Sequence, residues 1–148
     1  MTLMELRCPV CGAVNRVPEA RAGQPARCGK CKGPLATTVA PVEVTDATFE
    51  TVVTRASVPV LLDCWADWCG PCHALAPTID ALARAWAGRV VVGKLDVDAN
   101  PGTGARFDVR SIPTLLLFRE GRLVDRLVGV QSPAAIEARL QSLVGHAA

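Results

Sequence analysis

The segment Leu61-Leu62-Asp63-Cys64-Trp65-Ala66-Asp67-Trp68-Cys69-Gly70-Pro71-Cys72 decides the fold of this chain. It connects an apolar segment of strand character, Val58 to Leu62, to two cysteines separated by Gly-Pro, and a helical pattern follows. A Cys-X-X-Cys at a strand-to-helix junction, in a chain that alternates strands and helices, is the context in which a redox dithiol is found.

The two cysteines are expected at different positions on that helix. Pro71 suits a first helical turn, so Cys69 should lie at the N-terminal cap, where unpaired backbone N–H groups and the helix dipole favour a thiolate. Two intervening residues allow a small disulfide ring, which makes Cys69 the candidate nucleophile and Cys72 the candidate resolving thiol. On spacing alone, half of a metal site or a plain structural pair is an equal alternative.

The residues around these cysteines carry a resemblance to a known family. The segment Trp65 to Cys72 resembles the active-site sequence of thioredoxins, and the similarity covers about residues 42 to 146. Outside the active site it includes Asp63, Lys94, Pro77, Asn100-Pro101-Gly102-Thr103, Ser111-Ile112-Pro113-Thr114 and Gly129-Val130. The resemblance implies a buried Asp63–Lys94 pair, a helix kinked at Pro77 and a cis peptide bond before Pro113.

Asp63 interrupts an apolar strand, where burial should raise the pKa of its carboxyl group and a nearby Lys94 should lower it. The resemblance makes Asp63 the candidate proton acceptor for Cys72, with a purely structural buried pair as the alternative. For Lys94 the structural and functional interpretations stand equal.

The resemblance also implies a shallow apolar groove that binds protein disulfides, with Pro113 facing the cysteine pair and the backbone of Ile112 exposed to an extended polypeptide. Its lining residues would be Trp68, Gly70, Pro71, Ile112, Pro113, Gly129 and Val130. Trp65 is expected to pack in the core rather than contact substrate.

Three residues depart from the family pattern. Cys64 replaces an aromatic, and strand alternation places it on the opposite face from Asp63, so we interpret it as a small buried hydrophobe rather than a regulatory thiol. His73 follows Cys72 where Lys or Arg is usual, and we interpret it as a solvated helix residue rather than one that tunes the redox couple. Ser111 stands where Gly is common.

Four further cysteines predict a separate module at the N-terminus. Cys8 and Cys11 form one Cys-X-X-Cys knuckle, and Cys28 and Cys31 form a second one after sixteen residues. This spacing is typical of a zinc ribbon with four thiolate ligands, although two disulfides, a second redox pair or bound iron are alternatives. We therefore expect a zinc ribbon over residues 1–34, a linker over 35–41 and a thioredoxin domain over 42–148.

Charge and composition limit the remaining possibilities. Residues 1–41 hold six basic and two acidic groups, whereas residues 42–148 hold ten and twelve, so a positive module precedes a slightly negative domain. Residues 1–41 contain no aromatic side chain, which disfavours nucleic-acid binding. No segment approaches the roughly 18 apolar residues of a membrane span and no export signal is recognisable, so we expect a cytoplasmic protein without a membrane partner. We also expect a monomer.

Hydrophobic periodicity predicts the order β-α-β-α-β-α-β-β-α after the linker, and hence an α/β three-layer fold with a mixed five-stranded sheet. The expected strands are 42–44, 58–64, 89–96, 113–119 and 123–128, and the expected helices are 45–54, 70–88, 101–107 and one that starts at 132–133. Either Thr45 or Asp46 is expected to cap the first helix.

Taken together, these features predict a cytosolic reductase of protein disulfides, re-reduced by an NADPH-dependent thioredoxin reductase, with structural zinc in the N-terminal module and no cofactor in the thioredoxin domain. The partners are inferred from the family resemblance alone. The alternatives are a disulfide oxidase or isomerase on the same fold, and a zinc-ribbon adaptor or redox sensor in which oxidation of the four ligand cysteines releases the metal.

Overall fold

The computed structural model describes residues 3–8, 10–18, 26–35 and 40–145. The predicted boundaries of the module and the domain reach beyond these ranges, and residues 36–39 of the predicted linker lie outside them. Within the described ranges, no helix is both long enough and apolar enough to cross a membrane.

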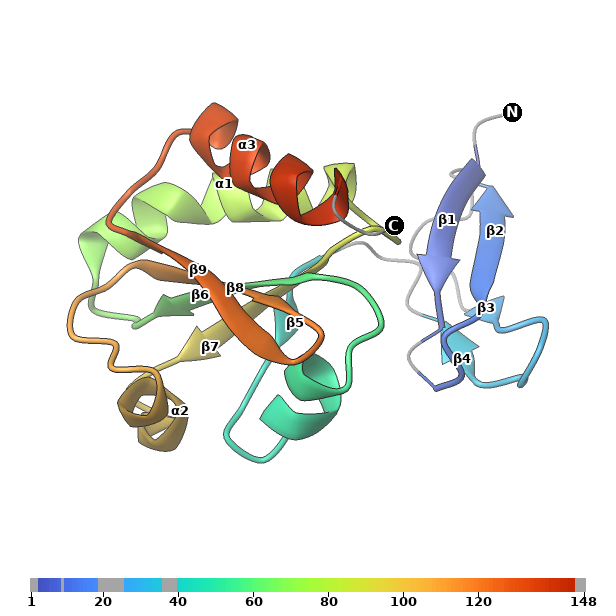
Figure 1. Ribbon diagram of the computed structural model, residues 1–148, viewed down its shortest axis with the longest axis horizontal. Helices are drawn as coiled ribbons and strands as arrows, with labels where there is room; N and C mark the ends of the chain where they lie inside the picture. The colour runs from blue at the N-terminus through green and yellow to red at the C-terminus, as the bar shows by residue number, and fades with distance from the viewer. Residues whose placement is uncertain (1–2, 9, 19–25, 36–39, 146–148) are drawn as a thin grey trace.

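The N-terminal part consists of two small antiparallel hairpins (Figure 1). Strand β1 (Leu3–Arg7) pairs with β2 (Val14–Pro18), and β3 (Ala26–Arg27) pairs with β4 (Pro34–Leu35). The buried side chains here are Leu6, Cys8, Val17, Cys28 and Leu35. Such a small apolar core supplies little folding free energy, so a module of this size needs an additional constraint such as a metal.

The remainder of the chain forms the predicted five-stranded mixed sheet, in the order β5-β7-β6-β8-β9. Strands β5, β7 and β6 are parallel, whereas β8 runs antiparallel to β6 and to β9, which confirms the predicted mixed sheet. The elements are β5 (Val42–Glu43), η2 (Glu50–Thr54), β6 (Val60–Trp65), α1 (Gly70–Ala85), β7 (Val91–Asp96), α2 (Pro101–Arg106), β8 (Thr114–Arg119), β9 (Arg122–Val128) and α3 (Pro133–Gly145).

Helices cover both faces of the sheet, as the three-layer prediction requires (Figure 1). Leu61 of β6 packs in one cluster with Ile79 of α1 and Leu140 of α3. Its neighbour Leu62 belongs to the cluster on the other face, which includes Phe49 and the half-buried Phe107. The central strand β6 is therefore buried on both sides, which explains its continuous apolar run.

The segment after β5 differs from the predicted helix over 45–54. Thr45 and Thr48 exchange hydrogen bonds between each backbone N–H and the other's Oγ1 at 2.9 and 3.2 Å, but these bonds close the turn that precedes the helix, whose N-cap is Phe49. The segment that follows is a turn and then the π-helical η2 rather than a regular α-helix. The carboxylate of Asp46 does not cap this segment. It accepts hydrogen bonds from the backbone N–H groups of Gly102 and Thr103 at the start of α2.

Helix α1 contains Pro77 in its interior and ends at Ala85, three residues before the predicted end at Gly88. Gly88 has φ +81° and closes the turn that follows. A Cβ on Gly88 would lie 2.5 Å from the carbonyl oxygen of Glu5, so β1 of the N-terminal module approaches the chain closely at this turn. This turn follows the end of α1 that is remote from Cys69.

Candidate active site and metal centre

Cys69 and Cys72 form a disulfide at the N-terminus of α1. Cys69 is the N-cap residue, and its Sγ accepts a hydrogen bond from the backbone N–H of Cys72 at 3.2 Å. Strand β6 ends at Trp65, and the short segment Ala66 to Trp68 connects it to Cys69 at the start of this helix. A sulfur at this position faces unpaired backbone N–H groups and the positive end of the helix dipole, both of which stabilise a thiolate.

Two loops lie next to the disulfide. The Sγ of Cys69 is 3.8 Å from the carbonyl oxygen of Ile112, and the peptide bond between Ile112 and Pro113 is cis, as expected from the resemblance. The backbone N–H of Gly129 donates to the carbonyl oxygen of Pro113 at 2.8 Å, which joins the second loop to the first. The structure therefore brings Ile112, Pro113 and Gly129 together with the cysteine pair.

The side chains around the disulfide differ in exposure. Cys69 and Cys72 are each only 3% exposed, whereas Trp68 is 72% and Val130 is 54% exposed. We call the predicted lining residues Trp68, Gly70, Pro71, Ile112, Pro113, Gly129 and Val130 the rim. The rim thus includes large exposed apolar side chains, whereas the two cysteines are buried.

The structure also adds residues that sequence patterns did not identify. Asp98 accepts a hydrogen bond from Nε1–H of Trp68 at 2.7 Å, although the two residues are thirty positions apart. Val128 at the end of β9 is 54% exposed, next to the rim residue Gly129. His73, interpreted as a solvated helix residue, contacts the carbonyl oxygen of Asp67 through Nε2 at 2.6 Å. A long-range contact such as that between Trp68 and Asp98 leaves no periodic signal in a sequence.

Asp63 is buried on β6, on the face of the sheet that α1 covers, and is 1% exposed. Neither carboxylate oxygen has a hydrogen-bond partner among the residues that the structure describes. Burial raises the pKa of Asp63 from 3.8 to about 6, and the positive charge of Lys94 opposes this shift. A carboxyl group with a pKa of this size can exchange a proton near neutral pH.

Lys94 lies on β7 directly beside Asp63 in the strand register, as expected. No salt bridge joins these two described residues. The Nζ of Lys94 instead lies 4.6 Å from the ring centroid of Trp65, a cation–π geometry. Lys94 therefore acts on Asp63 through its charge and packs on the half-buried Trp65.

Cys64 is fully buried on the face of β6 opposite to Asp63. Burial and then the negative charge of Asp63 raise the pKa of Cys64 to about 12, while the charge of Arg126 lowers it. A thiol with such a pKa is protonated and unreactive at neutral pH, which agrees with the interpretation of Cys64 as a small hydrophobe.

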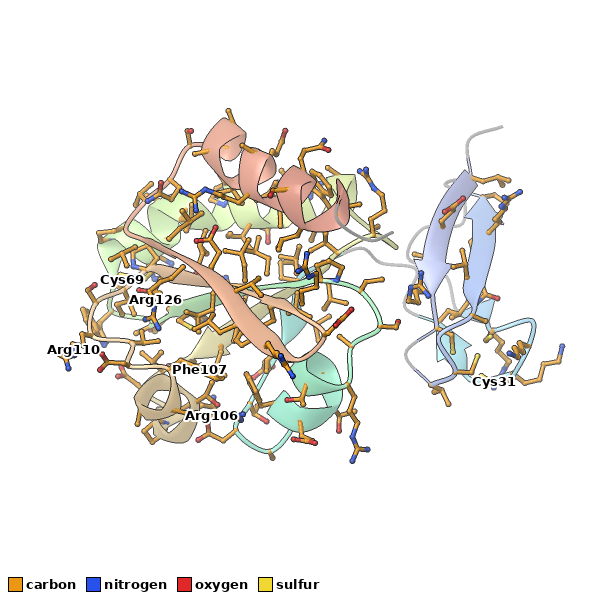
Figure 2. All side chains as sticks on the ribbon, in the orientation of Figure 1. Cys31, Cys69, Arg106, Phe107, Arg110 and Arg126 are labelled. Carbon is orange, nitrogen blue, oxygen red and sulfur yellow. A yellow bond between two sulfur atoms is a disulfide. The ribbon has the colours of Figure 1, made fainter. Side chains whose placement is uncertain are left out.

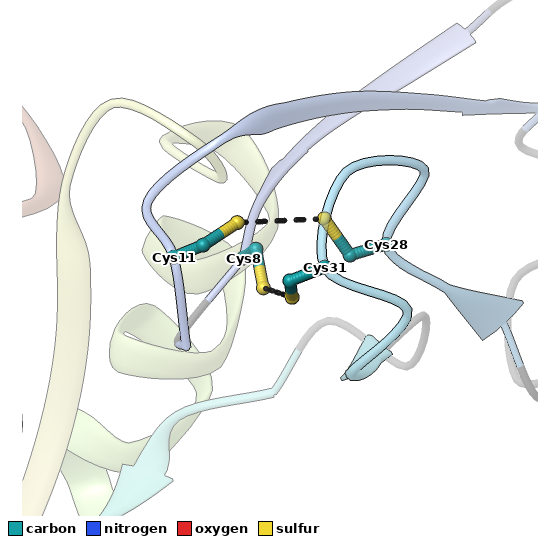
Figure 3. Close-up of side chains that lie close together, drawn as sticks. All are labelled: Cys8, Cys11, Cys28 and Cys31. Carbon is teal, nitrogen blue, oxygen red and sulfur yellow. Dashed lines mark hydrogen bonds between the residues drawn. The ribbon is translucent and has the colours of Figure 1, made fainter.

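The four cysteines predicted to bind a metal, Cys8, Cys11, Cys28 and Cys31, converge in the N-terminal module (Figure 3). All four Sγ atoms lie within 4.8 Å of one another, and the sulfurs of Cys8 and Cys31 and of Cys11 and Cys28 are 3.5 and 3.6 Å apart. A tetrahedral zinc ion with zinc–sulfur bonds of about 2.3 Å has sulfur–sulfur distances of about 3.8 Å. The arrangement therefore fits a metal bound by four thiolates.

Backbone and amide groups support these sulfurs as thiolates. The N–H groups of Val10, Lys30 and Gly33 point at the Sγ atoms of Cys8, Cys28 and Cys31 at 3.3–3.4 Å. Asn15 donates from Nδ2 to Cys28 Sγ at 3.5 Å, and its Oδ1 accepts from Gly29 N–H at 2.8 Å. Hydrogen bonds from the Cys31 backbone first and from Asn15 second lower the pKa of Cys28 to about 6, against the opposing effect of burial. Asn15 orients a ligand in the way that outer residues of metal sites do, a role its sequence position did not reveal.

Comparison with known proteins agrees with both parts of this description. A family model described as Thioredoxin matches residues 40–142, and a model described as "Thioredoxin 2, N-terminal" matches residues 7–33. The chain is 48% identical over 105 residues to thioredoxin from Mycobacterium tuberculosis, which covers 71% of this chain and 90% of that protein. It is 45% identical over 105 residues to thioredoxin from Alicyclobacillus acidocaldarius, covering 71% and 99%, and 51% identical over 88 residues to thioredoxin from Haemophilus influenzae, covering 60% and 82%. With a zinc-ribbon module ahead of a matching fold and disulfide, this chain belongs to the thioredoxin family of thiol–disulfide oxidoreductases.

Proposed function

We infer that this protein reduces disulfide bonds in other proteins by dithiol exchange at Cys69 and Cys72. The observation that carries this proposal is the position of the cysteine pair. The N-cap position on α1 favours a thiolate at Cys69. Its Sγ lies 3.8 Å from the carbonyl oxygen of Ile112, a residue of the rim, which also includes exposed apolar side chains. An apolar rim with accessible backbone suits an extended polypeptide rather than a small polar molecule.

In the first step the Cys69 thiolate attacks one sulfur of the substrate disulfide. A bond forms between Cys69 Sγ and that sulfur, the substrate disulfide breaks, and the other substrate sulfur leaves as a thiolate that takes a proton from solvent. The hydrogen bond that Cys69 Sγ accepts from the Cys72 N–H stabilises the attacking thiolate.

In the second step Cys72 releases the product. The Cys72 thiol gives its proton to Asp63, and the resulting thiolate attacks Cys69 Sγ. The internal disulfide forms, the mixed disulfide breaks, and the second substrate sulfur leaves as a thiolate that takes a proton from solvent. The raised pKa of Asp63, about 6, suits it to accept this proton and return it to solvent. The cycle oxidises the cysteine pair and delivers two electrons to the substrate.

The oxidised pair must then receive two electrons from another dithiol. We assign this step to an NADPH-dependent thioredoxin reductase, as is general in the family, and place the cycle in the cytoplasm with the protein acting as a monomer. The sequence resemblance and the relatives named thioredoxin support this assignment.

For the N-terminal module we propose zinc as the metal held by Cys8, Cys11, Cys28 and Cys31. The sulfur–sulfur distances and the soft thiolate donors support zinc, and four protein ligands leave no open position for catalysis. Its contribution would be structural, because it links two hairpins that share a very small apolar core.

Trapping of the intermediate tests the cysteine roles. Cys72→Ser should form a stable mixed disulfide between Cys69 and insulin, because the resolving thiol is absent, and Cys69→Ser should form none. Non-reducing electrophoresis with mass spectrometry of the adduct measures this. Normal turnover of insulin by Cys72→Ser would exclude the mechanism.

A further inference from the structure

His73 lies directly after Cys72, and both its backbone and its side chain hold the segment in front of the disulfide. The backbone N–H of His73 donates to the carbonyl oxygen of Cys69 at 3.3 Å. The ring atom Nε2 lies 2.6 Å from the carbonyl oxygen of Asp67. A carbonyl oxygen only accepts, so Nε2 of His73 must carry the hydrogen and donate it.

The imidazole itself is held in place by its neighbours. Its ring packs edge-on against Trp65, with the ring centroids 6.1 Å apart and the planes at 78°. Lys94 packs on the same indole, 4.6 Å from its centroid. The edge-on contact with Trp65 therefore supports the orientation that aims Nε2 at Asp67.

Between the two residues that His73 holds lies Trp68, the most exposed large apolar side chain of the rim. The backbone around Trp68 is tied on both sides by His73, and its indole Nε1 is tied to Asp98 at 2.7 Å. An indole that is 72% exposed has few packing contacts of its own, so these hydrogen bonds determine how it faces an incoming polypeptide.

We propose that His73 is a positioning residue for polypeptide substrates: through the Nε2 hydrogen bond to Asp67 it fixes Trp68 as one wall of the rim. This inference rests on the proposed reduction of protein disulfides. It assigns a role in substrate recognition to His73, which is exposed on α1 as the sequence predicted. The role depends on a hydrogen-bond donor and not on a positive charge.

Three variants separate a role of the hydrogen-bond donor of His73 from a role of its positive charge. His73→Leu removes the donor, and His73→Gln keeps an N–H donor at the same number of bonds from Cα without an ionisable group. Arg84→Leu places the same side chain at another exposed position of α1 and is the matched control. Thermal unfolding of each variant checks that α1 is intact.

The measurement is the rate at which pre-reduced protein reduces insulin, over a range of insulin concentrations, and reduces cystamine, a small disulfide without a polypeptide chain. For His73→Leu we expect the half-saturating insulin concentration to rise about fivefold, the size expected for one lost hydrogen bond, with the maximal rate within about twofold. The rate of cystamine reduction should be unchanged. The His73→Gln variant should have the half-saturating insulin concentration of the unsubstituted protein. Arg84→Leu should behave as the unsubstituted protein.

The outcomes distinguish this inference from the proposed function. If the unsubstituted protein reduces cystamine but not insulin, the proposed function fails. If it reduces insulin and His73→Leu does so with the same half-saturating concentration, His73 has no positioning role. Equal losses with insulin and cystamine, or a Gln variant that resembles Leu, would also overturn the inference, because they would indicate an effect of the imidazole charge on the cysteines. Should His73→Leu fail to fold, the comparison of Gln with the unsubstituted protein decides between donor and charge.

Discussion

Asp63 is an ionisable side chain enclosed by the sheet and by the helix that carries the disulfide, and its protonation is coupled to folding. The folded protein raises the pKa of this group to about 6 from 3.8, so it binds the proton more tightly than the unfolded chain does. The contribution of Asp63 to stability is therefore fully present below about pH 4 and is lost as the pH rises through about 6.

Replacement of this carboxyl group should accordingly stabilise the protein at neutral pH. Asp63→Asn removes a buried charge without a hydrogen-bond partner, and we expect the free energy of unfolding at pH 7 to rise by about 1–3 kcal/mol. At pH 4 the gain should disappear, because the native carboxyl is then protonated. Urea unfolding at the two pH values measures this.

A matched control uses Asp80, which is exposed on the same α1 helix. Asp80→Asn should change the free energy of unfolding by no more than about 0.5 kcal/mol at either pH. A destabilised Asp63→Asn at pH 7 would show that the carboxylate has a stabilising partner, contrary to this account. The same variant should slow the release of product from the mixed disulfide, since Cys72 loses its proton acceptor.

At the scale of secondary-structure elements, the strand spacing around β7 depends on a glycine. A Cβ on Gly93 would lie 2.9 Å from Cγ2 of Val44 and 3.3 Å from Cδ1 of Leu62, both fully buried. Gly93 is aligned with Val42 on one side and with Leu62 on the other. The close packing of β5, β7 and β6 therefore requires glycine at this position.

Two glycine substitutions should change stability in opposite directions. Gly93→Ala should lower the free energy of unfolding by about 1–3 kcal/mol, because the buried Val44 must move. Gly104→Ala, inside α2 with its nearest neighbours at 3.8 Å, should raise it by about 0.5–1 kcal/mol through helix propensity. Thermal or urea unfolding compares them, and equal effects of the same sign would contradict the packing described here.

The sequence predicted the elements whose residues carry a periodic or continuous apolar pattern. Strand β6 and the cap position of Cys69 follow from Val60 to Trp65 and from Pro71, because burial on two faces and an N-terminal proline have local causes. The π-helical turn at Glu50–Thr54 was missed, because its apolar spacing also fits an α-helix. Asp46 was assigned to the nearest helix, whereas its partner, Thr103, is fifty-seven residues away.

The candidate site likewise contains residues that the sequence predicted and residues that it missed. The six cysteines in pairs are recognisable because their spacing along the chain sets their geometry. The contact of Lys94 with Trp65 and the link from Trp68 to Asp98 depend on how distant elements pack, which no local pattern records.

In the molecule as a whole, the metal-binding cysteines and the disulfide belong to separate parts. Cys31 and Cys69 lie at opposite ends of the molecule in Figure 2, and the close approach of Glu5 to Gly88 is at the remote end of α1. The metal therefore has no direct contact through which to alter the chemistry at Cys69.

Metal binding and disulfide reduction should consequently be separable. Native mass spectrometry should find one zinc ion per chain, and Cys28→Ser should lose it because a tetrahedral site needs all four thiolates. Cys64→Ser, which changes a buried cysteine outside the cluster, should retain the metal. Insulin reduction by the Cys28→Ser variant should stay within about twofold of the unsubstituted rate, since the sites do not touch. Loss of zinc from Cys64→Ser alone, or full zinc binding by Cys28→Ser, would contradict the assignment of ligands.

The central claim is that the Cys69–Cys72 pair donates electrons to other proteins, and its reduction potential tests this claim most directly. The pair is equilibrated with dithiothreitol or glutathione buffers, and the oxidised fraction is measured by alkylation and mass spectrometry. Thioredoxins have potentials near −270 mV and disulfide isomerases near −180 mV, both of which serve here as benchmarks for the comparison. We expect a value near the first, with which the reduced pair gives electrons to most substrate disulfides. A value near the second, about 90 mV higher and thus about 4 kcal/mol more oxidising for two electrons, would mean that the protein forms or rearranges disulfides, and would contradict the reductase assignment.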